Sequence, residues 1–199
     1  MLPEKIIYVG VIINLIFTIW YIRSIFRGGT RPNLVSWSIW ALAPFVGVFL
    51  QIKSGAGLSF LGTFMSGFGP LLVIIFSLIN KNVFWKINIF DIICGFFSIL
   101  ALVLYIVTHK LSISIAFAIL SDGLAALPTI VKSWKFPETE TFYAYLGGII
   151  NNILALLIIT NWIFPVYSFS IYLLFVNVVI IFAIYHKKVL GLFNIYKSV

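Results

Sequence analysis

Seven apolar stretches, each close to the length that crosses a membrane, follow one another along this chain. About 20 residues of α-helix span the roughly 30 Å of hydrocarbon in a bilayer. Inside that layer the backbone can satisfy its hydrogen bonds only as helices or as a closed barrel, and stretches of this length favour helices. The sequence therefore predicts an all-α membrane protein with seven transmembrane helices. The predicted spans are residues 6–26, 34–52, 58–79, 88–107, 112–134, 142–163 and 168–186.

Composition agrees with this prediction. Charged residues make up 9% of the chain and hydrophobic residues 62%, whereas a soluble domain carries about 25% charged residues. The net charge of +8 comes from Lys and Arg in the short connections between the spans and not from one basic surface. It therefore predicts orientation in a lipid bilayer, with no nucleic acid as partner.

The distribution of basic residues predicts which side each connection faces. Short cytoplasmic loops carry an excess of Lys and Arg, and alternate connections here differ by ten against three. This places the N-terminus outside and the C-terminus inside, in an integral protein of the cytoplasmic membrane. The basic side holds Arg23, Arg27, Arg31, Lys81, Lys86, Lys132, Lys135, Lys187, Lys188 and Lys197; the other side holds Lys5, Lys53 and Lys110.

Two segments of the chain resemble each other and indicate an internal repeat. In each, an apolar span ends in a basic residue and Ser. A connection that contains a proline follows, and the next apolar span begins with aromatic residues. These marks are Arg23-Ser24, Pro32 and Trp37 in the first segment, and Lys132-Ser133, Pro137 and Tyr143 in the second. Duplicated membrane segments are typical of transporters.

The repeat extends to a third span in each half. Val73-Ile-Ile-Phe76 recurs as Val179-Ile-Ile-Phe182, at the same offset of 106 residues that separates Trp37 from Tyr143. An odd linker helix between two triplets makes the triplets parallel, because the chain starts each one from the same side. We expect residues 1–80 to form the first three-helix repeat, residues 81–110 the linker helix, and residues 111–199 the second repeat with a short cytosolic tail.

This three-plus-one-plus-three pattern resembles the PQ-loop families, which include the SWEET sugar transporters, the cystinosin-type amino-acid exporters and, more distantly, the KDEL receptors. The best local match is Leu127-Pro128-Thr129 followed by Lys132-Ser133, with Thr in place of the family's Gln. The resemblance implies two parallel three-helix bundles in which the third helix lies between the first two. It also implies a central cavity bordered by spans 1, 2, 5 and 6.

Asp122 is the most informative single residue. A carboxylate near the middle of a span costs a few kcal/mol or more unless it faces a cavity or a partner. Ala118, Ala125 and Thr129 share its helical face and form a narrow stripe of small residues. We expect Asp122 to bind and release a proton during transport, an interpretation that the acidic residue of the cystinosin-like proteins supports. The alternative is a protonated side chain that bonds to a neighbouring helix.

Four amides lie at similar depth in the predicted spans and are candidates for binding a solute. SWEET-like transporters place an Asn in the helix that holds Asn177, and the repeat aligns Asn14 beside Asp122. Asn151 and Asn152 are adjacent, so at most one of them can face a central cavity. Each amide alone could instead be a packing contact between helices.

Aromatic residues and prolines complete the candidate site. The two proline loops are followed by the aromatic residues Trp37, Trp40, Tyr143 and Tyr145. These residues could form an interfacial belt or a stacking wall for a ligand. For Trp40 we expect the stacking role. Pro44 and Pro128 interrupt the backbone hydrogen bonds of their helices. They are therefore candidate hinges for gating.

Motifs for catalysis and cofactor binding do not occur in the sequence. His109 and His186 lie at opposite ends of their spans, which predicts no metal site, and no HExxH or phosphate-binding Gly-Lys loop is present. We expect neither an enzyme nor a cofactor. The leading prediction is a transporter of a small polar solute, sugar-like or amino-acid-like, that works by alternating access and exchanges protons. The alternative is a non-transporting receptor or sorting protein of KDEL-receptor-like architecture, and a channel is a weaker third possibility.

Overall fold

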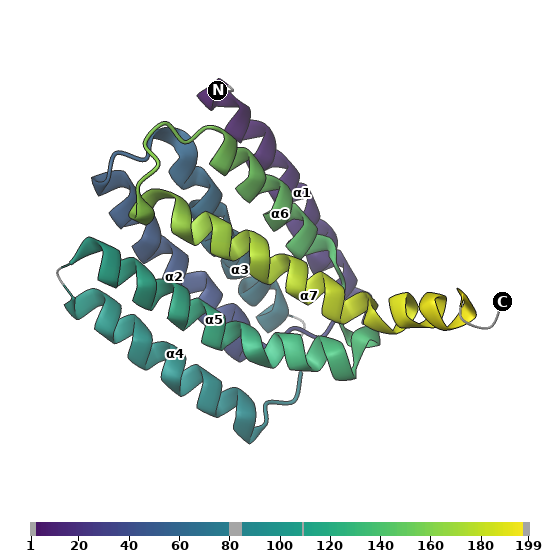
Figure 1. Ribbon diagram of the computed structural model, residues 1–199. Helices are drawn as coiled ribbons and strands as arrows, with labels where there is room; N and C mark the ends of the chain where they lie inside the picture. The colour runs from purple at the N-terminus through teal and green to yellow at the C-terminus, as the bar shows by residue number, and fades with distance from the viewer. Residues whose placement is uncertain (1–2, 80–84, 109, 197–199) are drawn as a thin grey trace.

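The computed structural model describes residues 3–79, 85–108 and 110–196, with the side chains of Tyr105 and of residues 189–196 excepted. These residues form seven α-helices and three short 3-10 helices (Figure 1). The α-helices are α1 (Ile7–Phe26), α2 (Leu34–Lys53), α3 (Phe60–Ile79), α4 (Ile89–Val107), α5 (Leu111–Lys135), α6 (Tyr143–Leu157) and α7 (Phe164–Tyr196). The prediction of an all-α chain is confirmed. Of the residues used above, Lys81, His109 and Lys197 lie outside the described part.

Five helical segments are long and apolar enough to cross a membrane. They are Glu4–Phe26, Leu34–Lys53, Gly57–Ile79, Leu111–Lys135 and Phe164–Lys188. The remaining two apolar segments are shorter, Ile89–Leu104 in α4 and Tyr143–Leu157 in α6. These lengths agree with the predicted membrane protein.

The boundary between α6 and α7 differs from the prediction. Helix α6 ends at Leu157 instead of residue 163, so its 15 residues extend about 22 Å. Helix α7 begins at Phe164, before the predicted residue 168, because a proline in the first helical turn, here Pro165, leaves no hydrogen bond unmade. Hydropathy did not separate the two helices, since the turn between them is itself apolar.

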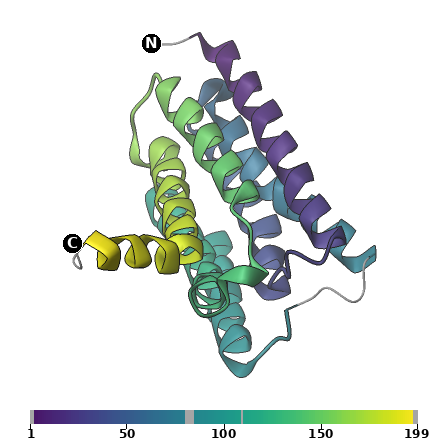
Figure 2. The ribbon, with the colours of Figure 1, turned by 90° about the vertical axis from the view of Figure 1, so that its right-hand side faces the viewer.

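Helix α7 is also much longer than the predicted span. It has 33 residues, and both ribbon views show its C-terminal part projecting away from the other helices (Figures 1 and 2). The portion that is long and apolar enough to cross a membrane ends at Lys188.

Polar caps begin two of the helices. The side chain of Asn33 accepts hydrogen bonds from the backbone N–H groups of Val35 and Ser36 at the start of α2. Asn88 and Asp91 form a capping box at the start of α4, in which each side chain accepts from the backbone N–H of the other. Caps of this kind satisfy N–H groups that the first turn of a helix leaves free.

The helices pack in a regular pattern (Figure 1). Helix α3 contacts both α1 and α2, and α7 contacts both α5 and α6. Across the middle of the molecule α1 packs on α6 and α2 packs on α5. Helix α4 lies against α5 and, to a smaller extent, α2. The main apolar core lies among these helices and includes Tyr21, Trp37, Trp40 and Tyr145.

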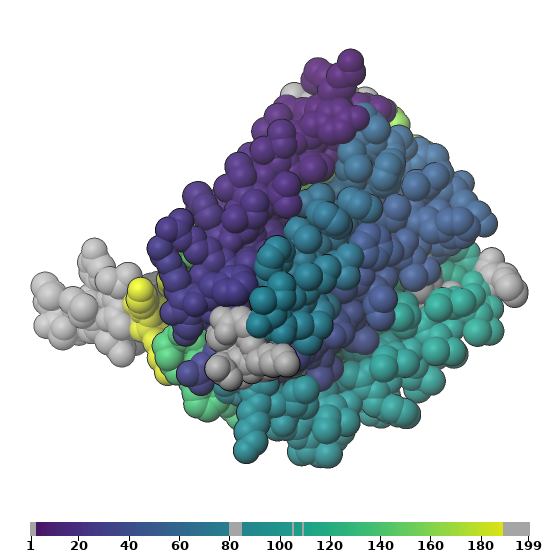
Figure 3. Space-filling view, turned by 180° about the vertical axis from the view of Figure 1, so that it is seen from behind, coloured from purple at the N-terminus to yellow at the C-terminus, as the bar shows by residue number. Residues whose placement is uncertain are grey.

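The outer surface carries large apolar side chains, as a lipid-facing surface should. Figure 3 shows one such face, with α1 along its upper edge and α4 along its lower edge. Exposed examples are Val9, Ile12 and Ile19 on α1, and Ile92, Phe96 and Ile99 on α4.

Glycines permit the closest contacts between helices. A Cβ added to Gly62 on α3 would lie 2.5 Å from the Cβ of Ala155 on α6, and one added to Gly147 on α6 would lie 2.8 Å from the Cβ of Phe17 on α1. A Cβ cannot move without its backbone, so these two positions require glycine for steric reasons. The close packing of α6 on α1 and α3 depends on them.

Gly62→Ala should lower the free energy of unfolding by about 1–3 kcal/mol, because the added methyl group overlaps Ala155. Gly67→Ala in the same helix is the matched control. Its Cβ would meet its nearest atoms at 3.4 Å, and alanine favours the helix by up to about 1 kcal/mol. Thermal unfolding of the two variants in detergent measures the difference, and equal losses of stability would contradict the packing described here.

Candidate functional site

A cavity lies at the centre of the molecule, bordered by every described α-helix except α4. Its volume is about 60 Å³, room for roughly four water molecules at the 10–15 Å³ that each requires. It is lined by Asn14, Thr18, Trp37, Trp40, Met65, Ser66, Gly69, Pro70, Asp122, Ala144, Tyr145, Gly148, Leu173, Val176, Asn177 and Ile180. Spans 1, 2, 5 and 6 border the cavity as expected, and α3 and α7 border it as well.

Asp122 lies on the cavity wall in the middle of α5, with 1% of its surface exposed. Its Oδ2 accepts a hydrogen bond of 2.8 Å from the hydroxyl of Tyr172 on α7, and its Oδ1 has no partner. The indole Nε1 of Trp40 donates to the backbone carbonyl of Asp122 at 3.3 Å. The carboxyl group is therefore held by one bond and keeps one oxygen available.

Two of the four candidate amides line the cavity. Asn14 on α1 accepts a long hydrogen bond of 3.5 Å from Thr18, and Asn177 on α7 donates to the carbonyl of Leu173 at 2.7 Å. The structure thus brings Asn14, Asn177, Trp40 and Asp122 together around one space, from four different helices.

The other two amides lie between helices and not on the cavity wall. Asn151 donates from Nδ2 to the carbonyl of Gly62 on α3 at 2.9 Å. Asn152 donates to the carbonyl of Gly148 in its own helix at 2.9 Å and lies 3.5 Å from the hydroxyl of Ser66. Both are completely buried. These bonds fasten α6 to α3, which is the packing alternative considered for these residues.

The candidate hinges Pro44 and Pro128 do not line the cavity, but a third proline, Pro70, does. A proline inside a helix leaves the carbonyl four residues earlier without its helical donor. For Pro44 that carbonyl belongs to Trp40, and for Pro70 it belongs to Ser66. Both of these residues line the cavity. The helical backbone is therefore weakened on α2 and α3 next to the cavity, and on α5 at Pro128, six residues from Asp122.

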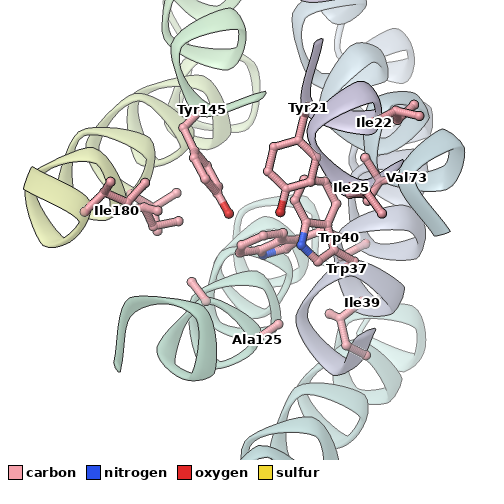
Figure 4. Close-up of a cluster of buried hydrophobic side chains, with 14 residues drawn as sticks. Tyr21, Ile22, Ile25, Trp37, Ile39, Trp40, Val73, Ala125, Tyr145 and Ile180 are labelled. Carbon is pink, nitrogen blue, oxygen red and sulfur yellow. The ribbon is translucent and has the colours of Figure 1, made fainter. Parts of the chain in front are cut away.

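An aromatic cluster contributes three residues to the cavity wall (Figure 4). It consists of Tyr21, Trp37, Trp40 and Tyr145, with ring centroids between 4.8 and 6.4 Å apart. In Figure 4 the hydroxyl groups of Tyr21 and Tyr145 face the same space beside the two indoles. The Nε1 of Trp37 has no hydrogen-bond partner among the described residues, whereas the two hydroxyls lie close to each other and to Glu140. Because Trp37 and Tyr145 are 2% and 3% exposed, they are core residues and not part of an interfacial belt.

Beyond the aromatic cluster, the two proline loops bind each other. We call residues 27–33 and 136–142, together with Lys132, the loop lock. Lys132 forms an ion pair with Glu140 in which both side chains are buried, and its Nζ donates to the carbonyl of Arg31 at 2.6 Å. The N–H of Arg31 donates to the carbonyl of Thr139 at 2.9 Å, and the hydroxyls of Thr30 and Thr141 lie 3.1 Å apart.

The loop lock and ten of the sixteen lining residues were not predicted from the sequence. Lys132 was used as a basic residue of the connections and as a mark of the repeat and of the PQ-loop resemblance, and Glu140 was not considered. Thr18 could have been found from its i+4 spacing to Asn14, because both then lie on one helical face. No local pattern could have paired Lys132 with the carbonyl of Arg31, which lies 101 residues away.

Comparisons with protein families, with curated proteins and with solved structures found no match to this chain. Its function is therefore inferred from the geometry of the cavity and the loop lock.

Lys132→Met should lower the free energy of unfolding by about 3–5 kcal/mol, because it leaves the carboxylate of Glu140 buried and unpaired. The double variant Lys132→Met, Glu140→Leu removes both charges and should recover most of that loss. Lys135→Met is the control, since Lys135 is exposed and its loss should change stability by less than about 0.5 kcal/mol. Thermal unfolding in detergent gives the comparison; a double variant no more stable than the single one would contradict a buried ion pair.

Proposed function

We propose that this protein is a membrane transporter that moves a small polar solute by alternating access, and that it is a divergent relative of the PQ-loop families. The observation that carries the proposal is the central cavity, which six helices enclose and which contains a buried carboxyl group and two amides. An intramembrane carboxyl group that faces a cavity is typical of a solute or proton pathway.

The helix contacts support the three-plus-one-plus-three arrangement. In each half the third helix lies against both of the others, and the pairs α1 with α6 and α2 with α5 bring the halves together. None of the described side chains of helix α4 lines the cavity, which suits a linker. We propose that residues 1–80 and 111–199 are two parallel repeats that move relative to each other.

The loop lock supports alternating access. It connects one loop from each proposed repeat, so separating the repeats at that end must break it. The basic residues of these loops support a cytosolic position of the lock in the cytoplasmic membrane, with the N-terminus outside. The conformation described here is therefore closed towards the cytosol. The prolines beside the cavity supply points at which the helices can bend.

Asp122 is the proposed proton carrier. It is enclosed, touches the cavity and keeps one free oxygen, and a carboxyl group in this position can bind a proton from either side as access alternates. In the alternative role, Asp122 stays protonated and serves only as a contact between helices through its hydrogen bond with Tyr172.

Asp122→Asn should fold normally and lose uptake driven by a pH gradient, because the amide keeps the shape of the side chain but cannot exchange a proton. Proteoliposomes with a trapped pH-sensitive dye, challenged with a panel of sugars, amino acids and amines, report the coupled proton movement. Glu4→Gln, which neutralises an exposed carboxylate outside the loop lock, should behave like the original protein. Undiminished pH-driven uptake by Asp122→Asn would reject proton coupling at this residue. Ligand binding with no flux of any solute would favour the receptor alternative.

The proposed orientation can be tested by cysteine labelling in intact cells. After Cys94→Ala removes the only native thiol, Lys5→Cys and Glu138→Cys place single cysteines at exposed positions near opposite ends of the molecule. A membrane-impermeant maleimide should label Lys5→Cys directly and Glu138→Cys only after permeabilisation. The reverse pattern would overturn the orientation and, with it, the proposed cytosolic position of the loop lock.

A further inference from the structure

Among the described residues, the cavity wall has one acidic side chain and no basic one. Asp122 is the only charged side chain among the lining residues, and none of them is Lys, Arg or His. Lys132, the buried cation further along α5, is already paired with Glu140 and with the carbonyl of Arg31. A solute that enters the cavity therefore meets a carboxyl group with no positive side chain beside it.

Several hydrogen-bond donors around the cavity are already engaged. The hydroxyl hydrogens of Thr18 and Ser66 are donated to oxygens of the protein, and so is the indole N–H of Trp40. Oδ1 of Asp122 has no partner, although it is buried. An unpaired acceptor of this kind costs free energy that a ligand carrying a positive charge would recover.

The remaining wall of the cavity is aromatic. Trp37, Trp40 and Tyr145 all line it, and their ring centroids lie 5.4 to 6.4 Å from one another. Aromatic faces attract cations by about 0.5–2 kcal/mol each, and most strongly where water is excluded. One buried donor without a partner among the described residues, Nε1 of Trp37, belongs to this same wall.

We infer that the solute is a small organic cation of the amine or quaternary ammonium class, and that it binds Asp122 in exchange for a proton. This inference rests on the proposed function. One carboxyl group can hold the cation or the proton but not both, so each half-cycle carries one positive charge across the membrane. The exchange is then electroneutral. The volume of about 60 Å³ limits the cation to a few non-hydrogen atoms.

The other titratable groups around the site are tyrosines and, beyond the aromatic cluster, the buried ion pair of Lys132 and Glu140, of which Glu140 lies close to Tyr145. Tyr172 on α7 donates its hydroxyl to Asp122, and Tyr145 on α6 lines the same cavity. The residues that α1, α2 and α3 contribute to the lining are uncharged, and α4 contributes none. Among the described residues that line the cavity or bond to its carboxyl group, Asp122 is thus the one carboxylic acid.

Equilibrium binding to the purified protein tests the class of solute. Tetramethylammonium is the probe, and tert-butanol, which has the same number of non-hydrogen atoms, is its neutral counterpart; tryptophan fluorescence reports occupancy because Trp37 and Trp40 line the cavity. We expect saturable binding of tetramethylammonium, binding of tert-butanol at least about tenfold weaker, and at least a tenfold loss of tetramethylammonium affinity in Asp122→Asn. The control Glu4→Gln, which neutralises an exposed carboxylate outside the cavity and the loop lock, should bind as the original protein does.

The pH dependence tests the exchange. Tetramethylammonium cannot gain or lose a proton, so any effect of pH on its binding belongs to the protein. Its affinity should fall as the pH is lowered, by up to tenfold per pH unit while the carboxyl group is mostly protonated, because proton and cation compete for one site. Asp122→Asn should remove this dependence.

Failure of the inference and failure of the proposed function give different results. Equal affinity for the two probes, no binding of tetramethylammonium, or unchanged binding by Asp122→Asn would overturn the cation inference, even if the proteoliposome panel revealed another transported solute. Selective binding of tetramethylammonium without counterflow in proteoliposomes would keep the cation site but overturn both proton exchange and the proposed transport.

Discussion

Polar groups between these helices have no water to bond with, so they must find partners on neighbouring helices. Side chains that donate to backbone carbonyls provide most of these contacts. Asn151 donates to Gly62 and joins α6 to α3, Gln51 donates to Val166 and joins α2 to α7, and Ser121 donates to Ser98 and joins α5 to α4. Such bonds are possible only where the helices approach closely, as the glycine at position 62 allows.

Around the cavity, some buried polar groups lack such partners. Oδ1 of Asp122 and Nε1 of Trp37 are buried without a partner among the described residues, and both residues line the same space. Leaving such groups unpaired costs about 1–3 kcal/mol each. A ligand that bonds to them recovers part of this cost, which links the least satisfied part of the core to the proposed binding of a solute.

The aromatic cluster and the loop lock determine the charge at one end of the cavity. At one end, an aromatic cluster lies beneath a lock of ionic and backbone hydrogen bonds, in which Lys132 connects Glu140 to the loop that holds Arg31. This pairing neutralises a cation that would otherwise repel a positively charged solute. The same contacts thus close the site and leave Asp122 as its only charge.

Much of the fold could be predicted from local sequence. Apolar length and the spacing of polar connections gave the number and order of the helices, because a backbone in lipid must satisfy its own hydrogen bonds within each segment. The end of α6 at Leu157 could not be found in this way, since the turn that follows is as apolar as a helix. The depth of Asp122, Asn14, Asn177 and Trp40 was also predictable, because depth follows from position along a helix.

Only the tertiary structure decided which of these polar residues share a space. The direction in which a side chain points depends on the rotation of its helix against its neighbours, and that rotation is determined by contacts between residues far apart in the chain. Asn151 and Asn177 lie at similar depth, yet one fastens α6 to α3 and the other lines the cavity. The sequence by itself determined which residues lie in helices and at what depth. Packing determined that Asp122 faces aromatic rings without a basic partner, because Lys132, the nearby lysine on its helix, is bound by a loop.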